Sequence, residues 1–333
     1  MSSIGSKVMS PKVIIHGGAG SALHDQGGLA AVRQDLHAMV AQIYQRAKAG
    51  ARAVDCVVYG CQLLEDTPRF NAGYGSVLQS DGQVRMSAAL MDGQAQRLSG
   101  VINVSRVAHP IDLAAHLQGA EDRVLSDVGS MELARELAIP LFDPITDLRL
   151  REWMQERANN FQRSMAGVVA ETSDAKDANA RRGTIGVVVL DSEGRLAVGT
   201  STGGKGLERI GRVSDSAMPA GTYANAQAAV SCTGIGEDII DECLAARLVI
   251  RISDGMTPEA ALAKSFAEAT HHQRDFGAIG LTQAGDILWG KTSDVLLAAY
   301  HTGQTLGDTL DQPHGTQTGR IAAANEFDIK FVG

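Results

Sequence analysis

The sequence predicts an α+β fold in which two antiparallel sheets are covered by helices on their outer sides. Apolar runs typical of strands come in adjacent pairs joined by turn residues, whereas helical patterns come in separate groups. The clearest pair lies in residues 184–204, where two apolar runs are joined by Asp-Ser-Glu-Gly. This order favours antiparallel hairpins over the regular strand–helix–strand alternation of a parallel sheet.

The first half of the chain contains strand, helix and hairpin patterns in turn. Residues 12–20, KVIIHGGAG, are predicted to form a buried strand that runs into a glycine turn. Helical periodicity covers residues 29–49 and 53–65, and the second helix is expected to stop before Pro68. The remaining predictions are a loop and hairpin over residues 70–93 with Asp81-Gly82 as the turn, a strand over 100–107, and two or three helices between 111 and 160.

A polar segment separates the two halves. Residues 171–182, ETSDAKDANARR, lack apolar periodicity and are predicted to form a mobile linker. After it, residues 228–253 predict a strand, a glycine turn and a helix, and Thr257 is a helix cap before Pro258. Residues 276–303 predict a further β-hairpin region.

Composition sets broad limits on function. The 333 residues are 44% hydrophobic and 20% charged, and the formal net charge of −8 argues against nucleic acid bound through basic patches. No apolar run approaches the roughly 18 residues that a membrane span needs, and the N-terminus is not typical of a signal peptide. We expect a cytoplasmic protein with reduced cysteines in its core, namely Cys56, Cys61, Cys232 and Cys243.

Three threonines stand where an apolar strand meets glycine. Thr184 follows Gly183 and opens a run of apolar residues, while Thr202 in TSTGG and Thr233 in SCTGIGE end strands and precede glycines. Glycine lets main-chain N–H groups approach a ligand, so a hydroxyl beside such a turn can contribute to an oxyanion hole. Taken singly, each motif is explained as well by an ordinary strand end. The HGGAG motif lacks the Lys-Ser/Thr of a phosphate-binding loop.

The segment GRVSDS places Arg212 and Asp215 three residues apart. Arginine can bind a carboxylate through two parallel hydrogen bonds, and aspartate can bind an ammonium group. Together they are able to recognise the two charged groups of an amino acid. An ordinary surface ion pair is the alternative interpretation of the motif alone.

As a set, these motifs resemble those of the plant-type L-asparaginases, also called isoaspartyl aminopeptidases, of the N-terminal nucleophile hydrolases. The resemblance weakens beyond about residue 245 and is carried, in chain order, by IHGGAG, LLEDTPRFNAGYGSV, LMDG, GTIGVVVLD, TSTGG, GRVSDS and SCTGIGE. It implies a four-layer αββα sandwich, a single domain over residues 1–333 and assembly as a dimer of αβ units. The two-sheet prediction from strand pairing is independent of it.

In this family the precursor cleaves itself at a Gly-Thr bond, which the resemblance identifies here as Gly183–Thr184. The products would be an α subunit of residues 1–183, whose linker starts at about residue 165, and a β subunit of residues 184–333. Thr184 would then carry a free α-amine. An α-amine has an unperturbed pKa of about 8, so it can take the hydroxyl proton near neutral pH.

The resemblance also assigns the remaining catalytic and substrate-binding residues. Thr202 would orient the Thr184 hydroxyl, while Thr233 and the Gly234 N–H would form the oxyanion hole. The substrate α-carboxylate would bind Arg212. Its α-amine would bind Asp215 with help from the Gly236 carbonyl, and Gly234 would also contact the substrate.

Asn71 lies near the cleavage bond in the family. The loop around it binds a structural sodium ion in relatives through main-chain carbonyls, and neutral carbonyl oxygens suit a hard monovalent cation. The corresponding residues here are Leu64, Glu65, Thr67, Phe70, Ala72 and Tyr74.

The resemblance implies an amidohydrolase that acts on β-aspartyl dipeptides and L-asparagine and needs no cofactor for catalysis. A glycosylasparaginase-like amidase is one alternative, although that activity usually accompanies exported or lysosomal proteins. A non-catalytic amino-acid-binding protein is the other, but it gives the Gly183–Thr184 junction no purpose. Asp275, Lys291 and Asp294 are candidates for the pocket edge on the leaving-group side, with surface positions equally open.

Overall fold

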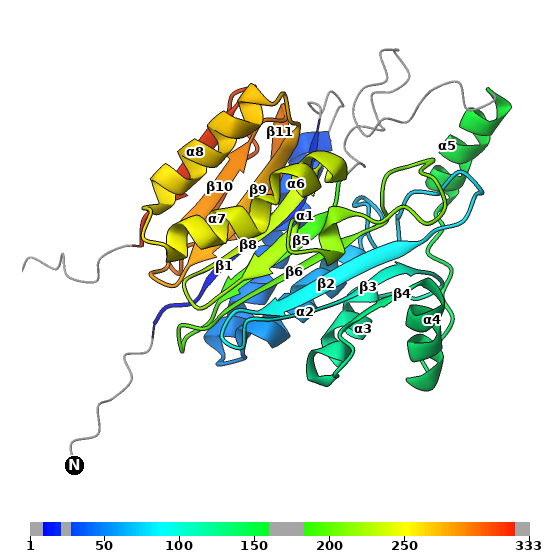
Figure 1. The fold of residues 1–333 in the computed structure, drawn as a ribbon, viewed down its shortest axis with the longest axis horizontal. Helices are drawn as coiled ribbons and strands as arrows, with labels where there is room; N and C mark the ends of the chain where they lie inside the picture. Colours follow the sequence, from blue (N-terminus) through cyan, green and yellow to red (C-terminus); the bar gives the residue numbers. More distant parts are fainter. Residues whose placement is uncertain (1–8, 21–27, 160–182, 324–333) are drawn as a thin grey trace, which may run out of the picture.

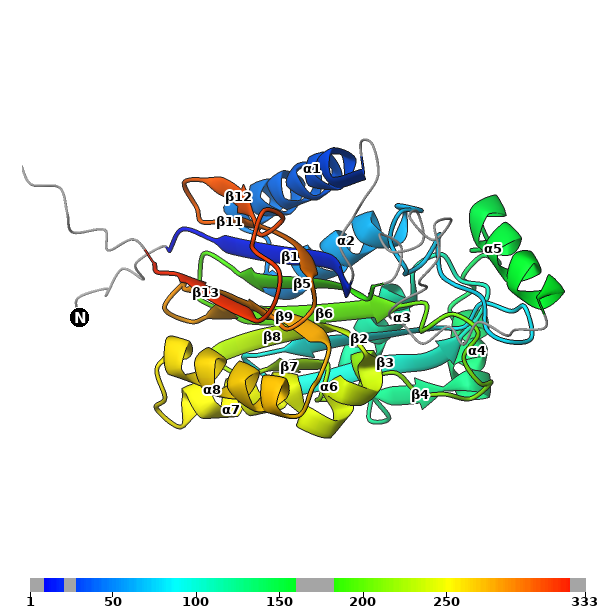
Figure 2. The ribbon, with the colours of Figure 1, turned by 90° about the horizontal axis from the view of Figure 1, so that it is seen from above.

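Two sheets packed face to face form the centre of the molecule, and helices cover the outer face of each (Figures 1 and 2). Helices α1 (Gly28–Lys48) and α2 (Ala53–Glu65) lie on the larger sheet, and α7 (Leu244–Ser253) and α8 (Pro258–His271) lie on the smaller one. Figure 2 shows the four layers from the side. The predicted αββα sandwich of the α+β class is confirmed.

The structure is a computed structural model that describes residues 9–20, 28–159 and 183–323. Its larger sheet contains β1 (Lys12–Gly20), β2 (Met86–Asp92), β3 (Arg97–Val104), β4 (Val124–Ser126), β5 (Ile185–Leu190), β6 (Leu196–Thr202), β11 (Val295–His301) and β12 (Leu306–Asp308). The order is β12-β11-β1-β5-β6-β2-β3-β4, antiparallel except for the pair β3–β4. Strands that precede Gly183 therefore interleave with strands that follow it.

The smaller sheet is built from the second half of the chain. It contains β7 (Thr222–Ala224), β8 (Ala228–Gly234), β9 (Phe276–Thr282), β10 (Ile287–Lys291) and β13 (Gln317–Ile321), in the antiparallel order β13-β10-β9-β8-β7. Apolar side chains such as Ile14, Val188, Val198 and Ile279 fill the space between the two sheets. This buried layer fixes how the sheets sit on each other, because shifting a strand by one residue would turn its apolar side chains away from the core.

Several predicted elements are confirmed. Helix α2 has the predicted bounds, and Thr257 caps α8 by accepting a hydrogen bond from the Ala260 N–H. The region between residues 111 and 160 contains α3 (Pro110–His116), α4 (Asp127–Glu136) and α5 (Asp147–Ala158). The hairpin predicted after residue 184 is formed by β5 and β6, and the one in residues 276–303 by β9 and β10.

Two predictions about glycine turns were wrong. The HGGAG segment continues β1 as far as Gly20, because β1 goes on pairing with β11 after a β-bulge between His16 and Ala19, whereas its pairing with β5 ends at His16. Asp81 and Gly82 do form a tight turn, but the residues directly before it, 66–80, form no strand. The hairpin instead joins β2 to β3 through residues 93–96.

The single helix predicted within residues 228–253 is broken in two. Helix α6 (Gly236–Glu242) ends at Cys243, which has a left-handed backbone conformation with φ of 47°, and α7 begins directly after it. The break also corrects the prediction that all four cysteines lie in the core. Cys56, Cys61 and Cys232 are buried, whereas Cys243 is exposed, and all four thiols are free.

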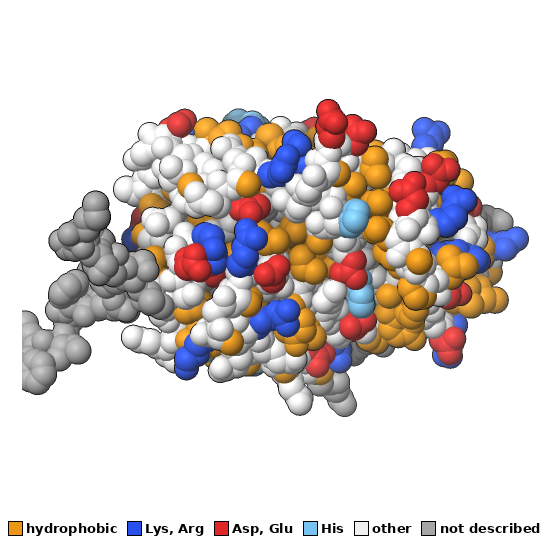
Figure 3. Space-filling view, turned by 90° about the horizontal axis from the view of Figure 1, so that it is seen from below, with side chains coloured by type: hydrophobic (Ala, Val, Ile, Leu, Met, Phe, Trp, Pro, Cys, Tyr) orange, Lys and Arg blue, Asp and Glu red, His pale blue; other side chains and the backbone are white. Residues whose placement is uncertain are grey.

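The linker predicted for residues 171–182, and the wider segment from residue 165, lie outside the described residues except for Gly183. Among the helices that the structure describes, none combines the length and apolar character that a membrane span requires. On the face seen in Figure 3, acidic and basic side chains are intermixed rather than gathered by sign. That face therefore offers no broad basic surface of the kind that holds a nucleic acid.

Candidate active site

Thr184 immediately precedes β5, next to the end of the neighbouring strand β6. Ile185 pairs with Ser201 in the antiparallel register, so Thr184 and Thr202 lie side by side, and their Oγ1 atoms are 3.3 Å apart. The Thr202 hydroxyl also accepts a hydrogen bond from the Gly204 N–H at 3.0 Å. The two hydroxyls therefore have a defined orientation at the end of the sheet.

A cleft opens at this point and brings together three of the motifs that the sequence singled out. TSTGG, GRVSDS and SCTGIGE all contribute to its wall, although they lie on different strands and loops. The lining residues are Thr184, Thr202, Gly204, Lys205, Arg212, Ser214, Asp215, Gly234, Ile235 and Gly236.

The junction before Thr184 is packed against the glycines of β1. A Cβ on Gly183 would overlap the Cα of Gly18 and lie 3.1 Å from the Gly17 carbonyl oxygen. Only glycine fits at residue 183 without moving the strand beside it. The HGGAG segment thus gives the main chain of the Gly183–Thr184 junction room to approach, which is a different role from binding a phosphate.

Thr233 and Gly234 end β8 in the opposite sheet. The Thr233 side chain is fully buried, and its hydroxyl has no hydrogen-bond partner among the described residues. Gly234 has φ of 133° and packs on the main chain of Phe276, where a Cβ would lie 2.5 Å from its Cα. An unpartnered buried hydroxyl beside a glycine N–H is an arrangement that can stabilise a developing negative charge.

Arg212 lies in the cleft between two carboxylates. Its guanidinium donates to Glu208 at 3.0 Å and to both oxygens of Glu237 at 3.1 Å. Glu208 is buried and also accepts hydrogen bonds from Gln79 and the Lys205 N–H. These bonds hold the guanidinium plane in place, as recognition of a planar carboxylate requires.

Asp215 is buried beside Arg212, and one of its two carboxyl oxygens accepts no described hydrogen bond. Its Oδ2 has no hydrogen-bond partner among the described residues. Burial raises the pKa of Asp215 to about 7, against the opposing effect of the Arg212 charge. Gly236 lies against both side chains, because a Cβ there would be 2.5 Å from Arg212 Nη2 and 2.8 Å from Asp215 Oδ1. The site therefore presents a cationic and an acidic group that converge beside Gly236.

Asn71 supports the turn after Thr202 and does not line the cleft. Its side chain donates to the Gly204 carbonyl at 2.6 Å and accepts from the Val77 N–H at 2.9 Å. Its main-chain carbonyl accepts from the Gly203 N–H at 2.9 Å. The described hydrogen bonds thus connect Asn71 to the turn that follows Thr202, and none of them joins it to Gly183 or Thr184.

The candidate sodium loop follows α2 and folds back on itself. Tyr74 N–H donates to the Glu65 carbonyl at 2.7 Å, and Thr67 N–H donates to the Leu64 carbonyl at 3.2 Å. A Cβ on Gly75 would lie 2.8 Å from the Phe70 carbonyl oxygen, so Gly75 packs directly against that carbonyl. Each carbonyl oxygen has a second lone pair, so the loop retains acceptors suited to a cation.

The three candidates for the leaving-group edge do not line the cleft. Lys291 is buried, and its ammonium donates to the carbonyls of Asp294 and Pro313 at 2.6 and 2.7 Å. The carboxyl of Asp275 is hydrogen-bonded to Ser293. Both side chains bond within loops, and none of the three candidates is among the residues that line this cleft.

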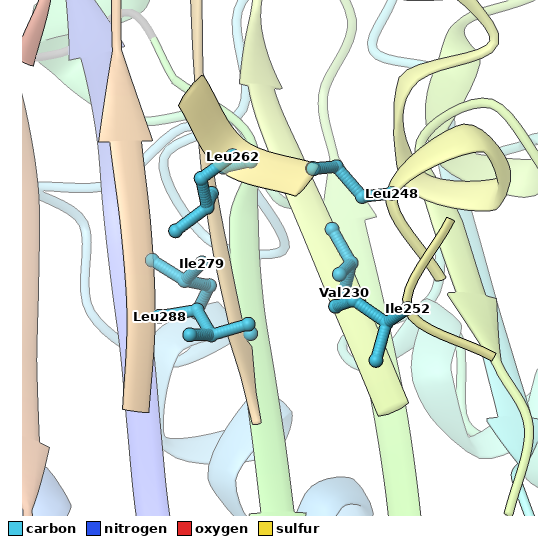
Figure 4. A pocket seen from close by; sticks show the side chains of 8 residues that line it. Val230, Leu248, Ile252, Leu262, Ile279 and Leu288 are labelled. Carbon is cyan, nitrogen blue, oxygen red and sulfur yellow. The ribbon is translucent and has the colours of Figure 1, made fainter. Parts of the chain in front are cut away.

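A second recess lies in the smaller sheet and is entirely apolar. Val230, Leu248, Ile252, Leu262, Ile279 and Leu288 line it, as Figure 4 shows. It lies between β8, β9, β10 and the helices that cover them, and it offers no nucleophile, acid or base. Of these two recesses, the cleft at Thr184 is the one that contains hydroxyl, cationic and acidic groups.

Sequence reasoning missed two acidic residues of the site, Glu208 and Glu237. Glu237 is the last residue of SCTGIGE, and Glu208 precedes Arg212 by four residues, so both were within or beside quoted motifs. Their role emerges only in the fold, where both bind the same guanidinium.

Comparison with known proteins places this site in a family. The family model described as Asparaginase matches residues 9–311. The chain belongs to this asparaginase family. Its isoaspartyl peptidase/L-asparaginase relative from a Nostoc species is 64% identical over 94% of the chain and 99% of the relative. A protein of the same name from a Synechocystis species is 60% identical over 94% of each chain.

More distant members of the asparaginase family also align over most of their length. A plant-type L-asparaginase from Pyrococcus horikoshii is 32% identical over 90% of this chain and 98% of the relative. The resemblance inferred from the motifs is therefore confirmed. The match extends well beyond residue 245, after which the motif resemblance was expected to weaken.

Proposed function

We propose that this asparaginase-family protein is a self-processing amidohydrolase that cleaves β-aspartyl dipeptides and L-asparagine with Thr184 as nucleophile. The observation that carries the proposal is the paired hydroxyls of Thr184 and Thr202 in a cleft that also contains Arg212 and Asp215. The names of relatives at 60% and 64% identity support the same activity.

The first reaction is cleavage of the chain itself. The Thr184 hydroxyl attacks the Gly183 carbonyl carbon, the peptide C–N bond breaks, and an ester joins Gly183 to the hydroxyl. Water then hydrolyses the ester, which leaves a carboxylate on Gly183 and a free amine on Thr184. The products stay together because strands from both pieces interleave in the larger sheet. We propose that the two pieces form one domain.

The matured Thr184 then combines nucleophile and base. Its neutral amine takes the hydroxyl proton as the oxygen attacks the β-carbonyl carbon of the aspartyl group. Thr233 and the Gly234 N–H stabilise the oxyanion that forms. The leaving amine or ammonia departs with a proton, and water releases aspartate from the ester on Thr184.

Substrate recognition uses the charges at the other end of the cleft. Arg212 binds the α-carboxylate and Asp215 binds the α-ammonium, with the Gly236 carbonyl beside it. A bound ammonium favours the ionised form of Asp215, whose pKa burial raises to about 7 in the free site. L-asparagine and β-aspartyl dipeptides present the same two groups and differ only in the leaving group.

The two alternative functions have less support. A glycosylasparaginase-like amidase shares the nucleophile but is not the activity in the names of the relatives quoted above. A non-catalytic amino-acid-binding protein needs Arg212 and Asp215 but not the close packing of Gly183 on Gly18.

Three further properties belong to this proposal. A sodium ion would stiffen the loop that contains Asn71 if it bound the main-chain carbonyls of Leu64, Glu65, Thr67, Phe70, Ala72 and Tyr74. Replacing sodium by choline should then lower the Tm. Assembly as a dimer of αβ units is tested by light scattering. A cytoplasmic location, in keeping with the free thiols, is tested by cell fractionation.

The activity is tested with L-asparagine and three peptides. β-Asp-Leu and asparagine should be hydrolysed. The α-linked Asp-Leu and N-acetyl-β-Asp-Leu should react at least about 100-fold more slowly, because each loses a group that the cleft binds and unpaired buried charge costs several kcal/mol. Comparable release of leucine from all three peptides would remove the assigned roles of Arg212 and Asp215.

A further inference from the structure

A layer of polar side chains lies directly beneath the catalytic threonines, between the two sheets. His16 in β1, Gly186 in β5 and Thr200 in β6 are paired across the larger sheet. Thr222 and Ser231 are paired in the smaller sheet. All four polar side chains are fully buried.

These residues form one continuous chain of hydrogen bonds. His16 Nε2 lies 2.9 Å from Ser231 Oγ, which lies 2.8 Å from Thr200 Oγ1. The Thr222 hydroxyl lies 2.6 Å from Thr200 Oγ1 and donates to the Ser216 carbonyl at 2.8 Å. Ser216 directly follows Asp215, so the chain leads from β1 to the turn that holds the substrate-binding acid.

The strand register places this polar layer next to the layer that contains the catalytic threonines. Side chains two residues apart on a strand share a face. Thr202 is therefore one step from Thr200 and Thr233 one step from Ser231, and Thr184 is likewise two residues before Gly186. A further step away from the cleft are Ile14, Val188, Val198 and Ala229, which belong to the apolar core between the sheets.

The glycine in the sequence Thr-Ile-Gly makes this layer possible. A Cβ on Gly186 would overlap both His16 Nε2 and Ser231 Oγ. The imidazole thus crosses over Gly186 to reach the other sheet. The main chain of Thr184 also acts on the imidazole by favouring its protonated form, although burial lowers the pKa of His16 to about 3 and keeps it neutral.

Stability alone does not account for a polar layer here. Replacing a buried hydrogen-bonded pair by apolar groups of the same shape is often neutral or stabilising, and the next layer is apolar. A hydrogen-bonded network does fix side-chain positions more narrowly than apolar packing, because bonds have preferred lengths and angles.

We propose that His16, Ser231, Thr200 and Thr222 are positioning residues that hold the catalytic threonines and the Asp215 turn in register across the two sheets. The inference rests on the proposed role of Thr184 as nucleophile. It assigns a purpose to three motif residues that the catalytic roles leave unused: the histidine of IHGGAG, the second glycine of GTIG and the serine of SCTG.

Thr200 is the residue at which the chain of hydrogen bonds can be interrupted with the least disturbance of its neighbours. In Thr200→Val the side chain keeps its shape and loses its hydroxyl. Ser231 keeps its bond to His16, and Thr222 keeps its bond to the Ser216 carbonyl. Neither neighbour becomes an unpartnered buried group, but the connection between them is broken. Thr200→Ser retains the hydroxyl and serves as the rescue variant.

The experiment measures kcat and KM on β-Asp-Leu for wild type, Thr200→Val and Thr200→Ser, each shown by denaturing gel to be cleaved. A loss of positioning should lower kcat of Thr200→Val about tenfold or more, since small misplacements of reacting groups are costly. KM should change far less, and Thr200→Ser should retain most of kcat.

Thr282→Val and Thr282→Ser are the matched controls. Thr282 is also a buried strand threonine, and it bonds to Asp286 at the far end of β9 from the cleft. Equal losses of kcat in Thr200→Val and Thr282→Val, or a wild-type kcat in Thr200→Val, would overturn the proposal. If Thr200→Val folds but stays uncleaved while Thr200→Ser cleaves itself, the proposal is supported. The reason is that the Thr184 hydroxyl is the proposed nucleophile both in self-cleavage and in substrate hydrolysis.

Ser231→Ala interrupts the same chain of hydrogen bonds in the other sheet. Ser99→Ala, at another buried serine, is its control. If Thr200→Val fails to fold, a kcat loss confined to Ser231→Ala supports the proposal, and equal kcat in both serine variants contradicts it. Thr184→Ala is measured alongside. Full activity in Thr184→Ala would refute the proposed nucleophile itself, whereas a normal Thr200→Val beside an inactive Thr184→Ala would refute only the positioning layer.

Discussion

Gly236 lies so close to Asp215 that a Cβ on the glycine would be 2.8 Å from Asp215 Oδ1. The same Cβ would be 2.5 Å from Nη2 of Arg212. The glycine therefore leaves the space in which both charged side chains converge, and its position in SCTGIGE has a steric reason.

Gly236→Ala should disturb substrate binding without preventing folding. The added methyl displaces the carboxyl and the guanidinium, so kcat/KM on β-Asp-Leu should fall by about 10- to 100-fold, which corresponds to roughly 1.4–2.8 kcal/mol. Gly119→Ala is the control, because nothing lies within 4 Å of a Cβ at that position. Unchanged kcat/KM in Gly236→Ala would place substrate recognition elsewhere.

The buried carboxyl of Asp215 should weaken the fold at neutral pH. Burial raises its pKa from 3.8 to about 7. Between these values the folded chain binds more protons than the unfolded chain, so the group's contribution to stability falls as pH rises from about 4 to about 7 and then levels off. Asp215→Asn removes this cost and should be inactive, because the neutral amide does not supply the negative charge that compensates a buried ammonium.

This prediction is measured on uncleaved protein, in which no new amine titrates nearby. Thr184→Ala and Thr184→Ala/Asp215→Asn are compared by thermal unfolding from pH 4 to pH 8. The Tm advantage of the asparagine variant should grow up to pH 7. A constant difference, or one that shrinks, would mean that Asp215 is ionised at low pH in the folded chain.

Gly183 should tolerate no side chain. Because a Cβ there overlaps the Cα of Gly18, Gly183→Ala must displace the junction or β1. Self-cleavage should slow by at least about tenfold, since small misplacements of reacting groups are costly. A time course on denaturing gels measures this rate. Gly20→Ala is the control in β1, because no atom of the described residues lies within 4 Å of a Cβ at that position, and it should cleave at the wild-type rate.

Thr233 should matter to kcat more than to binding. Its buried hydroxyl has no other partner among the described residues, and losing one oxyanion-hole donor typically lowers kcat by about 100- to 1000-fold. Thr233→Val in matured enzyme should show this loss with a smaller change in KM, and Thr233→Ser should restore part of it. A wild-type kcat in Thr233→Val would remove this residue from the mechanism.

Local signals predicted single elements well. The bounds of α2 and the cap of α8 follow from apolar periodicity, Pro68 and Thr257-Pro258, which act within a few residues. The hairpin of β5 and β6 was predictable for the same reason, since its turn residues lie between two apolar runs.

Contacts between distant segments were not predictable in this way. The bulge in β1 depends on pairing with β11, and the hydrogen bond between His16 and Ser231 joins residues 215 positions apart. The two carboxylates on Arg212 come from the segment before it and from α6. Motif resemblance named the threonines, Arg212 and Asp215, but gave no reason for the histidine or for Gly186.

The most direct test of the proposed mechanism is the N-terminal sequence of the smaller fragment in protein that hydrolyses β-Asp-Leu. Thr184 can act as an N-terminal nucleophile only if the bond to Gly183 is broken. The fragment should begin Thr-Ile-Gly-Val, and Thr184→Ala should remain one uncleaved, inactive chain. An active protein that stays uncleaved, or whose fragment begins at another residue, would contradict the proposed role of Thr184.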